Sequence, residues 1–116
     1  MISYYKGEFL TQTDLPINAN LFRGLGVFET IKFINHKIIF FDEHMHRLFS
    51  NHNFFNFSNI SKNNIYKTAI NILKKNNLKE GLLKIIILPI DNNFNDIEYY
   101  IFYNSFCRPP PSTKPA

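Results

Sequence analysis

The chain has 116 residues, of which 45% are hydrophobic and 19% are charged, so one packed domain is expected and two ordinary ones are excluded. Thirteen Lys and Arg against nine Asp and Glu give a net charge of +4 without any dense basic block, so the charge does not indicate a nucleic-acid partner. A single cysteine excludes an internal disulfide framework and agrees with a reducing compartment. The apolar runs are far shorter than the roughly 20 residues that span a bilayer, and no signal-peptide pattern opens the chain. We therefore expect a cytoplasmic protein with neither a membrane nor a nucleic-acid partner.

The first part of the chain predicts β-structure. Residues 2–10 form two short strands around a turn, and residues 27–33 predict a further strand rich in β-branched and aromatic side chains. Asn35-His36 predicts a tight turn into a strand over residues 37–41. The glycines of Arg23-Gly24-Leu25-Gly26 come before a strand and not before a helix, which excludes a dinucleotide-binding fingerprint and favours a tight backbone approach.

Two helices and a last pair of strands are predicted next. Asp42 is a suitable N-cap for a first helix, and Ser61 is one for a second. The core positions of these helices share one face at helical spacing: Met45, Leu48, Phe49, Ile65, Ala69, Ile72 and Leu73. Strands over 82–90 and 97–103 follow. This order predicts an α+β fold with a mostly antiparallel sheet and two helices packed on one face.

The chain divides at residue 107. We expect residues 1–107 to form one small domain, and residues 108–116, which are rich in proline, to form an extended linker or tail. Cys107 next to this segment has no general base fixed near it, so it is interpreted as an ordinary thiol.

Four histidines raise the question of a metal site. His44 and His46 are two residues apart on a predicted helix and point to different faces, whereas metal pairs on helices use a spacing of three or four residues. His36 lies in a turn, and His52 lies eight residues after His44. We predict no metal site.

Arg47 lies on the first predicted helix, directly after a hairpin. Its planar guanidinium could bind an anion with two parallel hydrogen bonds. The competing interpretations are a solvated side chain, or an ion pair with Glu43 one helical turn earlier. Spacing alone leaves these alternatives open.

A resemblance to a known family is carried by three segments, which are Gly26-Val27-Phe28-Glu29-Thr30-Ile31-Lys32, Asn35-His36-Lys37 and Asp42-Glu43-His44-Met45-His46-Arg47-Leu48. They resemble the N-terminal small domain of the class IV aminotransferases, the fold-type IV pyridoxal phosphate enzymes. That family includes branched-chain and D-amino acid aminotransferases and aminodeoxychorismate lyase. Its pattern is a VFET strand, an NGK turn and a helix with H-x-x-R-L, and the match is strongest over residues 20–50.

The resemblance implies roles for particular residues. The Arg of H-x-x-R-L binds the cofactor phosphate in the family, which implies that Arg47 binds the phosphate of pyridoxal 5'-phosphate in the complete enzyme. Weak or no binding of this cofactor is expected for the 116 residues alone. Phe28 corresponds to an aromatic residue of the substrate pocket, and Thr30, two residues later on the same face of the strand, is expected to line that pocket as well. The resemblance also implies that the chain forms a homodimer or associates with a C-terminal large domain.

Three departures from the family pattern stand out. Leu25 replaces an acidic residue before the strand, and the segment 89–92 lacks an Arg that some relatives use for substrate. The Lys that forms the Schiff base lies in the large domain of relatives, and Lys114, flanked by a proline-rich sequence, is no substitute. No catalytic residue is therefore assigned within these 116 residues.

Two functions remain in view. The first is the small domain of an aminotransferase, which moves an amino group from an amino acid to a 2-oxo acid, or of aminodeoxychorismate lyase, inactive without the Lys-bearing domain. The alternative is a non-catalytic module that kept the fold and uses exposed aromatic side chains for protein binding or self-association.

Overall fold

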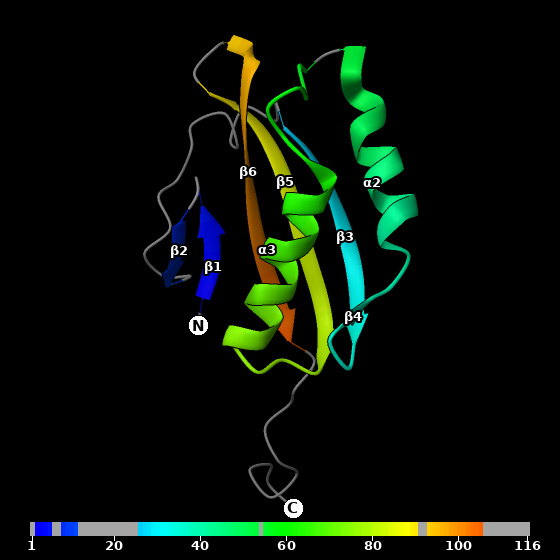
Figure 1. Ribbon diagram of the computed structural model, residues 1–116, viewed down its shortest axis with the longest axis vertical. Helices are drawn as coiled ribbons and strands as arrows, with labels where there is room; N and C mark the ends of the chain where they lie inside the picture. Colours follow the sequence, from blue (N-terminus) through cyan, green and yellow to red (C-terminus); the bar gives the residue numbers. More distant parts are fainter. Residues whose placement is uncertain (1, 6–7, 12–25, 54, 91–92, 106–116) are drawn as a thin grey trace, which may run out of the picture.

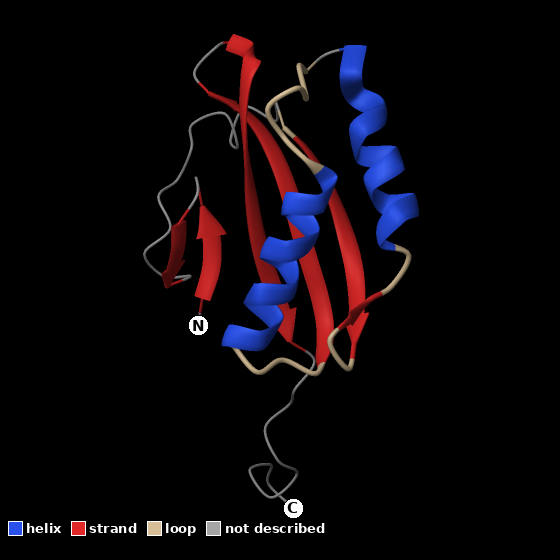
Figure 2. Ribbon diagram, viewed as in Figure 1, coloured by secondary structure: helices blue, strands red, loops and turns tan. Residues whose placement is uncertain are grey.

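The computed structural model describes residues 2–5, 8–11, 26–53, 55–90 and 93–105. They form a six-stranded antiparallel sheet with two helices on one of its faces (Figures 1 and 2). The strand order is β2-β1-β6-β5-β3-β4. The elements are β1 (Ile2–Tyr5), β2 (Glu8–Thr11), β3 (Val27–Ile34), β4 (Lys37–Ile38), α2 (Phe41–Phe49), the 3₁₀-helix η2 (Ser50–Asn53), α3 (Lys62–Lys75), β5 (Glu80–Ile90) and β6 (Asn93–Ser105). The predicted α+β class, with a mostly antiparallel sheet and helices on one face, is confirmed.

The main core lies between the sheet and the helices. Alternation along β5 directs Leu83, Ile85 and Ile87 toward the helices, and all three are fully buried. The helices bury the apolar positions that their spacing predicts, namely Met45, Leu48, Ile65, Ala69, Ile72 and Leu73, and Phe49 packs against them at the edge. Fully burying side chains of this size stabilises the fold by about 1.5–3 kcal/mol each, so this layer fixes where α2 and α3 lie on the sheet.

A smaller cluster lies on the opposite face of the sheet, called the second face from here on. It consists of Ile86, Leu88 and Tyr100, with Phe102 packed against them. The hydroxyl of Tyr100 donates a hydrogen bond of 2.8 Å to Oε1 of Glu98. Strand β5 is thus apolar on both faces, which explains its nearly continuous hydrophobic sequence.

The hairpin between β3 and β4 turns at Asn35 and His36, as predicted. Both residues have positive φ, 51° and 66°, which is the backbone of a tight two-residue hairpin turn. Gly26 is also explained by close packing. A Cβ atom there would lie 2.8 Å from the carbonyl oxygen of Ile87 and would overlap the Leu88 side chain.

The start of α2 differs from the prediction. Strand β4 ends at Ile38, the helix begins at Phe41, and its N-cap is Phe40 with φ 55°, not Asp42. Asp42 instead lies in the first turn with Glu43, where a negative charge interacts favourably with the helix dipole. The second helix begins as predicted, since the Ser61 hydroxyl accepts a hydrogen bond from the Asn64 amide.

Strand β6 is longer than predicted. It begins at Asn93 and ends at Ser105, beyond the predicted range of 97–103 at both ends. Backbone pairing with β5 extends the strand through polar residues whose own strand propensity is low. No helix among the described residues is long and apolar enough to cross a membrane.

Candidate functional site

Glu29 places a carboxylate on the helix face of β3. It alternates in register with Ile31 and Phe33, which are both fully buried, and its own side chain is only 12% exposed. A carboxylate on a core-facing position requires partners, because an unpaired buried charge is costly. From Val27 to Ile31, strand β3 pairs with β5 on one side, and no other described strand pairs with it on the other side. The carboxylate therefore lies at the edge of the sheet.

Helix α2 supplies two partners for this carboxylate. His44 and Arg47 are three residues apart and so lie on one side of the helix. The His44 Nδ1 atom lies 2.6 Å from Oε1 of Glu29. The Arg47 Nη2 atom lies 2.9 Å from Oε1 of Glu29, and Nε lies 3.1 Å from both carboxylate oxygens. These contacts attach the middle of α2 to the edge strand.

The orientation of the Arg47 guanidinium has a chemical consequence. Glu29 binds the side formed by Nε and Nη2, whereas Nη1 makes no hydrogen bond within the described part of the chain. A guanidinium has five N–H donors, so the end formed by Nη1 and the second hydrogen of Nη2 is still available. The Arg47 side chain is 66% exposed. Its outer end can thus present two parallel donors to an anion such as a phosphate.

His44 is best described with its proton on Nδ1. An ionised carboxylate can only accept a hydrogen bond, so the short contact with Glu29 requires an N–H at Nδ1 of His44. The same nitrogen lies 3.2 Å from Nη2 of Arg47, and it cannot accept from Arg47 while it donates to Glu29. We therefore interpret the His44–Arg47 contact as close packing of two groups that share one carboxylate.

Glu29, His44 and Arg47 form a cluster in which the pKa values of Glu29 and Arg47 are both shifted. Partial burial raises the pKa of Glu29, but the hydrogen bonds from Arg47 and His44 and their charges outweigh it, and the net pKa is lowered from 4.5. The Glu29 hydrogen bonds and negative charge raise the pKa of Arg47 above its ordinary value. The pair is therefore ionised at neutral pH, with its opposite charges in contact.

A second group of side chains lies on the second face of the sheet. Phe28 and Thr30 point there from β3, and the Phe28 side chain is exposed. Thr30 is paired in register with Lys84 of β5, whose Nζ atom lies 4.4 Å from the centroid of the Phe28 ring. Lys32 is exposed two residues further along the same face. This group combines an aromatic surface, a hydroxyl and two cations.

Comparison with known proteins identifies the family. The sequence model of the family described as amino-transferase class IV matches residues 26–116. The chain belongs to the class IV aminotransferases. No curated protein matches its sequence.

Solved structures of branched-chain amino acid aminotransferases share the fold. The branched-chain amino acid aminotransferase of Escherichia coli superposes with a TM-score of 0.77 at 20% identity, over 90% of this chain and 40% of that one. The M4 mutant of the branched-chain enzyme of Thermobaculum terrenum gives 0.74 at 12% identity, over 92% and 39%. A putative branched-chain enzyme of Thermotoga maritima gives 0.70 at 18% identity, over 93% and 38%. The chain thus spans about 40% of the length of these proteins.

The sequence-predicted site residues of this class IV chain fall into two places. Arg47 lies on α2, over the helix face of β3, whereas Phe28 and Thr30 project from the second face of the same strand. The structure brings Phe28 and Thr30 together with Lys84 and does not place them against Arg47. Both groups lie beside the same sheet edge, so a ligand in contact with both would lie across that edge.

Sequence reasoning missed Glu29 and Lys84. It considered Glu43 as the partner of Arg47, but the carboxylate that Arg47 binds is Glu29. Glu29 could have been found because it is a charged residue at a strand position that alternates in register with the apolar Ile31 and Phe33. Lys84 could have been found as the charged residue within the apolar run of residues 82–90.

The other candidates for chemistry make no site among the residues that can be placed. In that part of the chain, no three His, Cys, Asp or Glu side chains are grouped so as to hold a metal ion. His44 is bound to Glu29, and His46 is exposed. Cys107, Lys114 and Arg23-Gly24-Leu25 lie outside the described residues, as does the side chain of His52.

Proposed function

We propose that this chain acts as the small domain of a pyridoxal phosphate-dependent class IV enzyme, in which Arg47 binds the cofactor phosphate. The observation that carries the proposal is that Glu29 binds only one side of the Arg47 guanidinium, through Nε and Nη2, and leaves its outer end available. Glu29 fixes the direction of the donors before a ligand arrives, which reduces the entropy lost on binding. His44 holds the same carboxylate from the preceding turn of α2.

The described residues fit one part of the cofactor. Arg47 can meet two phosphate oxygens, but the Glu29 charge partly cancels its own, so a phosphate dianion needs further donors. Pyridoxal phosphate, when bound, supplies the electron sink for removing the amino group of an amino acid. Within this chain the contribution is binding and orientation. Residues 1–107 form the small domain in this proposal, and residues 108–116 form a linker.

The second face of the sheet is proposed to contact the substrate. Phe28 supplies an apolar surface, Thr30 supplies a hydroxyl, and Lys84 supplies a positive charge beside the Phe28 ring. This combination suits a compound with a carboxylate next to an apolar group, such as an amino acid or its 2-oxo acid. We infer amino transfer between such acids as the reaction of the complete enzyme, with the related lyase reaction as the second candidate.

Catalysis is proposed to require residues beyond this chain. A Schiff-base lysine must lie in a shaped, partly desolvated pocket, whereas Lys32 and Lys84 are both exposed. The chain also spans about 40% of the structures that it resembles. We therefore propose an association with a Lys-bearing large domain or a homodimer, located in the cytoplasm, and no activity for the 116 residues alone.

Covalent trapping tests this proposal. The purified chain is incubated with pyridoxal phosphate, reduced with borohydride, and examined by intact mass and peptide mapping, with pyridoxal as the matched compound that lacks the phosphate. We expect only low labelling spread over several lysines. Complete labelling of one lysine, specific to the phosphate compound, would show a Schiff-base site within this chain and would overturn the proposal of inactivity.

A further inference from the structure

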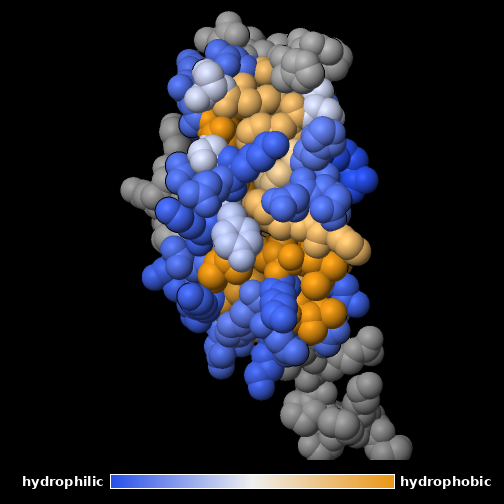
Figure 3. All heavy atoms as spheres, turned by 45° about the vertical axis from the view of Figure 1, so that its right-hand side comes forward, coloured by the Kyte–Doolittle hydropathy of each residue, from blue (hydrophilic) through white to orange (hydrophobic). Residues whose placement is uncertain are grey.

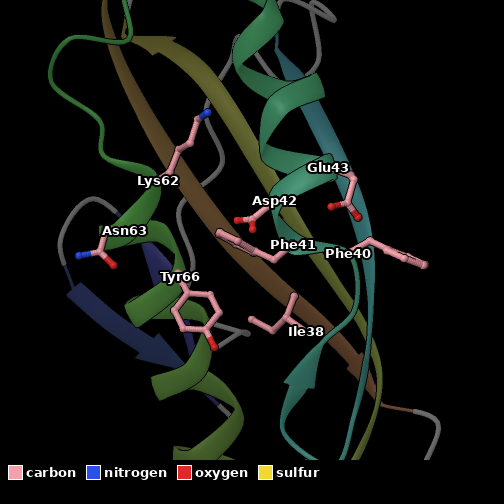
Figure 4. A pocket seen from close by; sticks show the side chains of 8 residues that line it. All are labelled: Ile38, Phe40, Phe41, Asp42, Glu43, Lys62, Asn63 and Tyr66. Atoms are coloured by element: carbon pink, nitrogen blue, oxygen red, sulfur yellow. The ribbon is translucent and has the colours of Figure 1, made fainter.

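A groove separates the beginnings of α2 and α3 on the helix face of the molecule. Its volume is about 630 Å³, and its lining residues are Ile38, Phe40, Phe41, Asp42, Glu43, Lys62, Asn63 and Tyr66 (Figure 4). None of these residues takes part in the Glu29–His44–Arg47 cluster or in the group on the second face. Apolar side chains reach the surface between the polar side chains of this side of the molecule (Figure 3). The groove is therefore a separate feature of the fold.

Aromatic rings form its apolar wall. Phe41 and Tyr66 meet edge to face, with ring centroids 5.0 Å apart and planes at 74°, so they form a corner between the two helices. Phe40 is 69% exposed and Tyr66 is 41% exposed, which is unusual for large apolar rings without a partner surface. Phe40 also holds a left-handed backbone conformation with φ 55°, which is costly for a bulky residue. The groove thus has an apolar surface, and the fold keeps Phe40 in it at the cost of a strained backbone conformation.

The charge of the groove is negative on the α2 side. Asp42 and Glu43 line it from the first turn of α2, and both are exposed. The cation opposite them is Lys62, whose Nζ atom lies 5.2 Å from the centroid of the Phe49 ring and is drawn to that ring. An occupant with positive charges beside apolar, ring-stacking groups would complement this surface.

The chain contains a segment of that chemistry. Residues 108–115 read Arg-Pro-Pro-Pro-Ser-Thr-Lys-Pro, so four prolines are combined with two cations and no acidic residue. Proline-rich segments bind aromatic-lined grooves as preformed polyproline II helices. Positive charges on such a segment would complement the acidic side chains of this groove. The proline-rich, basic segment is therefore complementary to the aromatic, acidic lining of the groove.

The segment is also long enough to reach the groove. Strand β6 ends at Ser105, which pairs with Gly81, and Gly81 in turn pairs with Phe33. Phe33 pairs with Ile38 in the lining of the groove. Three strand spacings separate Ser105 from Ile38, which is about 15 Å. Ten residues in polyproline II conformation span about 31 Å, about twice that distance.

We propose that residues 108–115 bind in cis to the groove between α2 and α3 of the same chain. The prolines stack on Phe41 and Tyr66, and Lys114 pairs with Asp42 and Glu43. Binding in this way fixes the direction in which the chain leaves β6, and it orients whatever is attached to that segment relative to the helix face.

Paramagnetic relaxation measured by NMR on the full 116-residue chain tests this proposal. In a Cys107→Ser, Ala116→Cys background, a nitroxide is attached at position 116 of the isotope-labelled chain. We expect the amide signals of Phe41, Asp42 and Tyr66 to lose most of their intensity relative to the sample with a reduced nitroxide. The loss should largely disappear in Arg108→Gln, Lys114→Gln, a variant that leaves the described domain untouched.

A groove variant and a mixing experiment complete the design. Asp42→Asn, Glu43→Gln should abolish most of the signal loss, whereas the matched control Asp96→Asn, at an exposed carboxylate outside the groove, should not change it. Equal signal loss in all these variants, or none in the parent chain, would overturn the proposal. Signal loss in isotope-labelled chain mixed with spin-labelled chain of natural isotopic composition would show that a second copy occupies the groove, which would overturn binding in cis.

Discussion

Arg47 and Glu29 meet between helix α2 and strand β3, with Nη2 and Nε of the guanidinium 2.9 and 3.1 Å from the nearest carboxylate oxygens. The two residues are 18 apart in sequence, and they come from elements that are fixed independently by the buried side chains of the core. The ion pair therefore joins β3 to α2, two elements whose positions are already fixed by the core. Its exposed end is the feature on which the proposed cofactor site depends.

Removing the Glu29 charge should destabilise the fold modestly. Glu29→Gln keeps the size of the side chain but loses the charged acceptor for both His44 and Arg47, so we expect the free energy of unfolding to fall by about 1 kcal/mol. Urea denaturation measures it. Asp96→Asn is the control, because Asp96 is an exposed carboxylate on β6 that lies outside the cluster, and it should change stability by less than about 0.5 kcal/mol. Equal losses in both variants would contradict the assigned role of Glu29.

The same carboxylate should make stability depend on pH. Its pKa is lowered in the folded state relative to 4.5, so its contribution is complete above the unfolded-state pKa and is lost as the pH falls through the folded-state pKa. The stability difference between wild type and Glu29→Gln should thus be constant above about pH 5 and shrink below about pH 4. Urea denaturation at a series of pH values measures this. A difference that grows on acidification would show that the sign is wrong.

The two faces of β3 should respond differently to truncation. Phe28→Ala removes an exposed ring and one cation–π contact, so we expect a loss of less than about 1 kcal/mol. Ile31→Ala, three residues away on the helix face, leaves a cavity in the core and should cost about 3 kcal/mol. Comparable losses in denaturation experiments would mean that Phe28 is packed rather than available to a ligand.

The β3–β4 turn offers a stabilising substitution. His36 has φ 66°, a conformation that glycine adopts without steric cost, so His36→Gly should raise the free energy of unfolding by about 1 kcal/mol. The matched control is His46→Gly on the exposed face of α2, where glycine should instead cost about 1 kcal/mol. Thermal or urea denaturation decides the sign at each position. Destabilisation by His36→Gly would contradict the interpretation that the backbone of His36 is strained in this turn.

The sequence predicted those elements whose patterns are local. The apolar spacing of α3 and its Ser61 cap, and the β-branched run of β5, each identify an element without tertiary information. The start of α2 could not be predicted in this way, because Asp42 looks like an N-cap, whereas the short β4 and the left-handed Phe40 start the helix earlier. The full length of β6 comes from its pairing with β5, which is a non-local contact.

The candidate site was predictable only in part. Arg47 and Phe28 are proposed as site residues through a distributed family pattern, and neither could be assigned from spacing alone. The Glu29–Arg47 pair joins residues far apart in sequence, and its recognition needs the helix to be placed on the sheet. The separation of Arg47 from Phe28 and Thr30 by the thickness of the sheet likewise depends on which face each side chain takes.

The most direct measurement for the central claim is an NMR titration of the Arg47 side-chain N–H signals with pyridoxal phosphate and, in parallel, with pyridoxal. Binding of the phosphate at the outer end of the guanidinium predicts shifts of the Arg47 signals with the phosphate compound alone. It also predicts weaker binding in Arg47→Lys, since an ammonium cannot present two parallel donors. Equal shifts with both compounds, or shifts at other residues without any at Arg47, would contradict the claim.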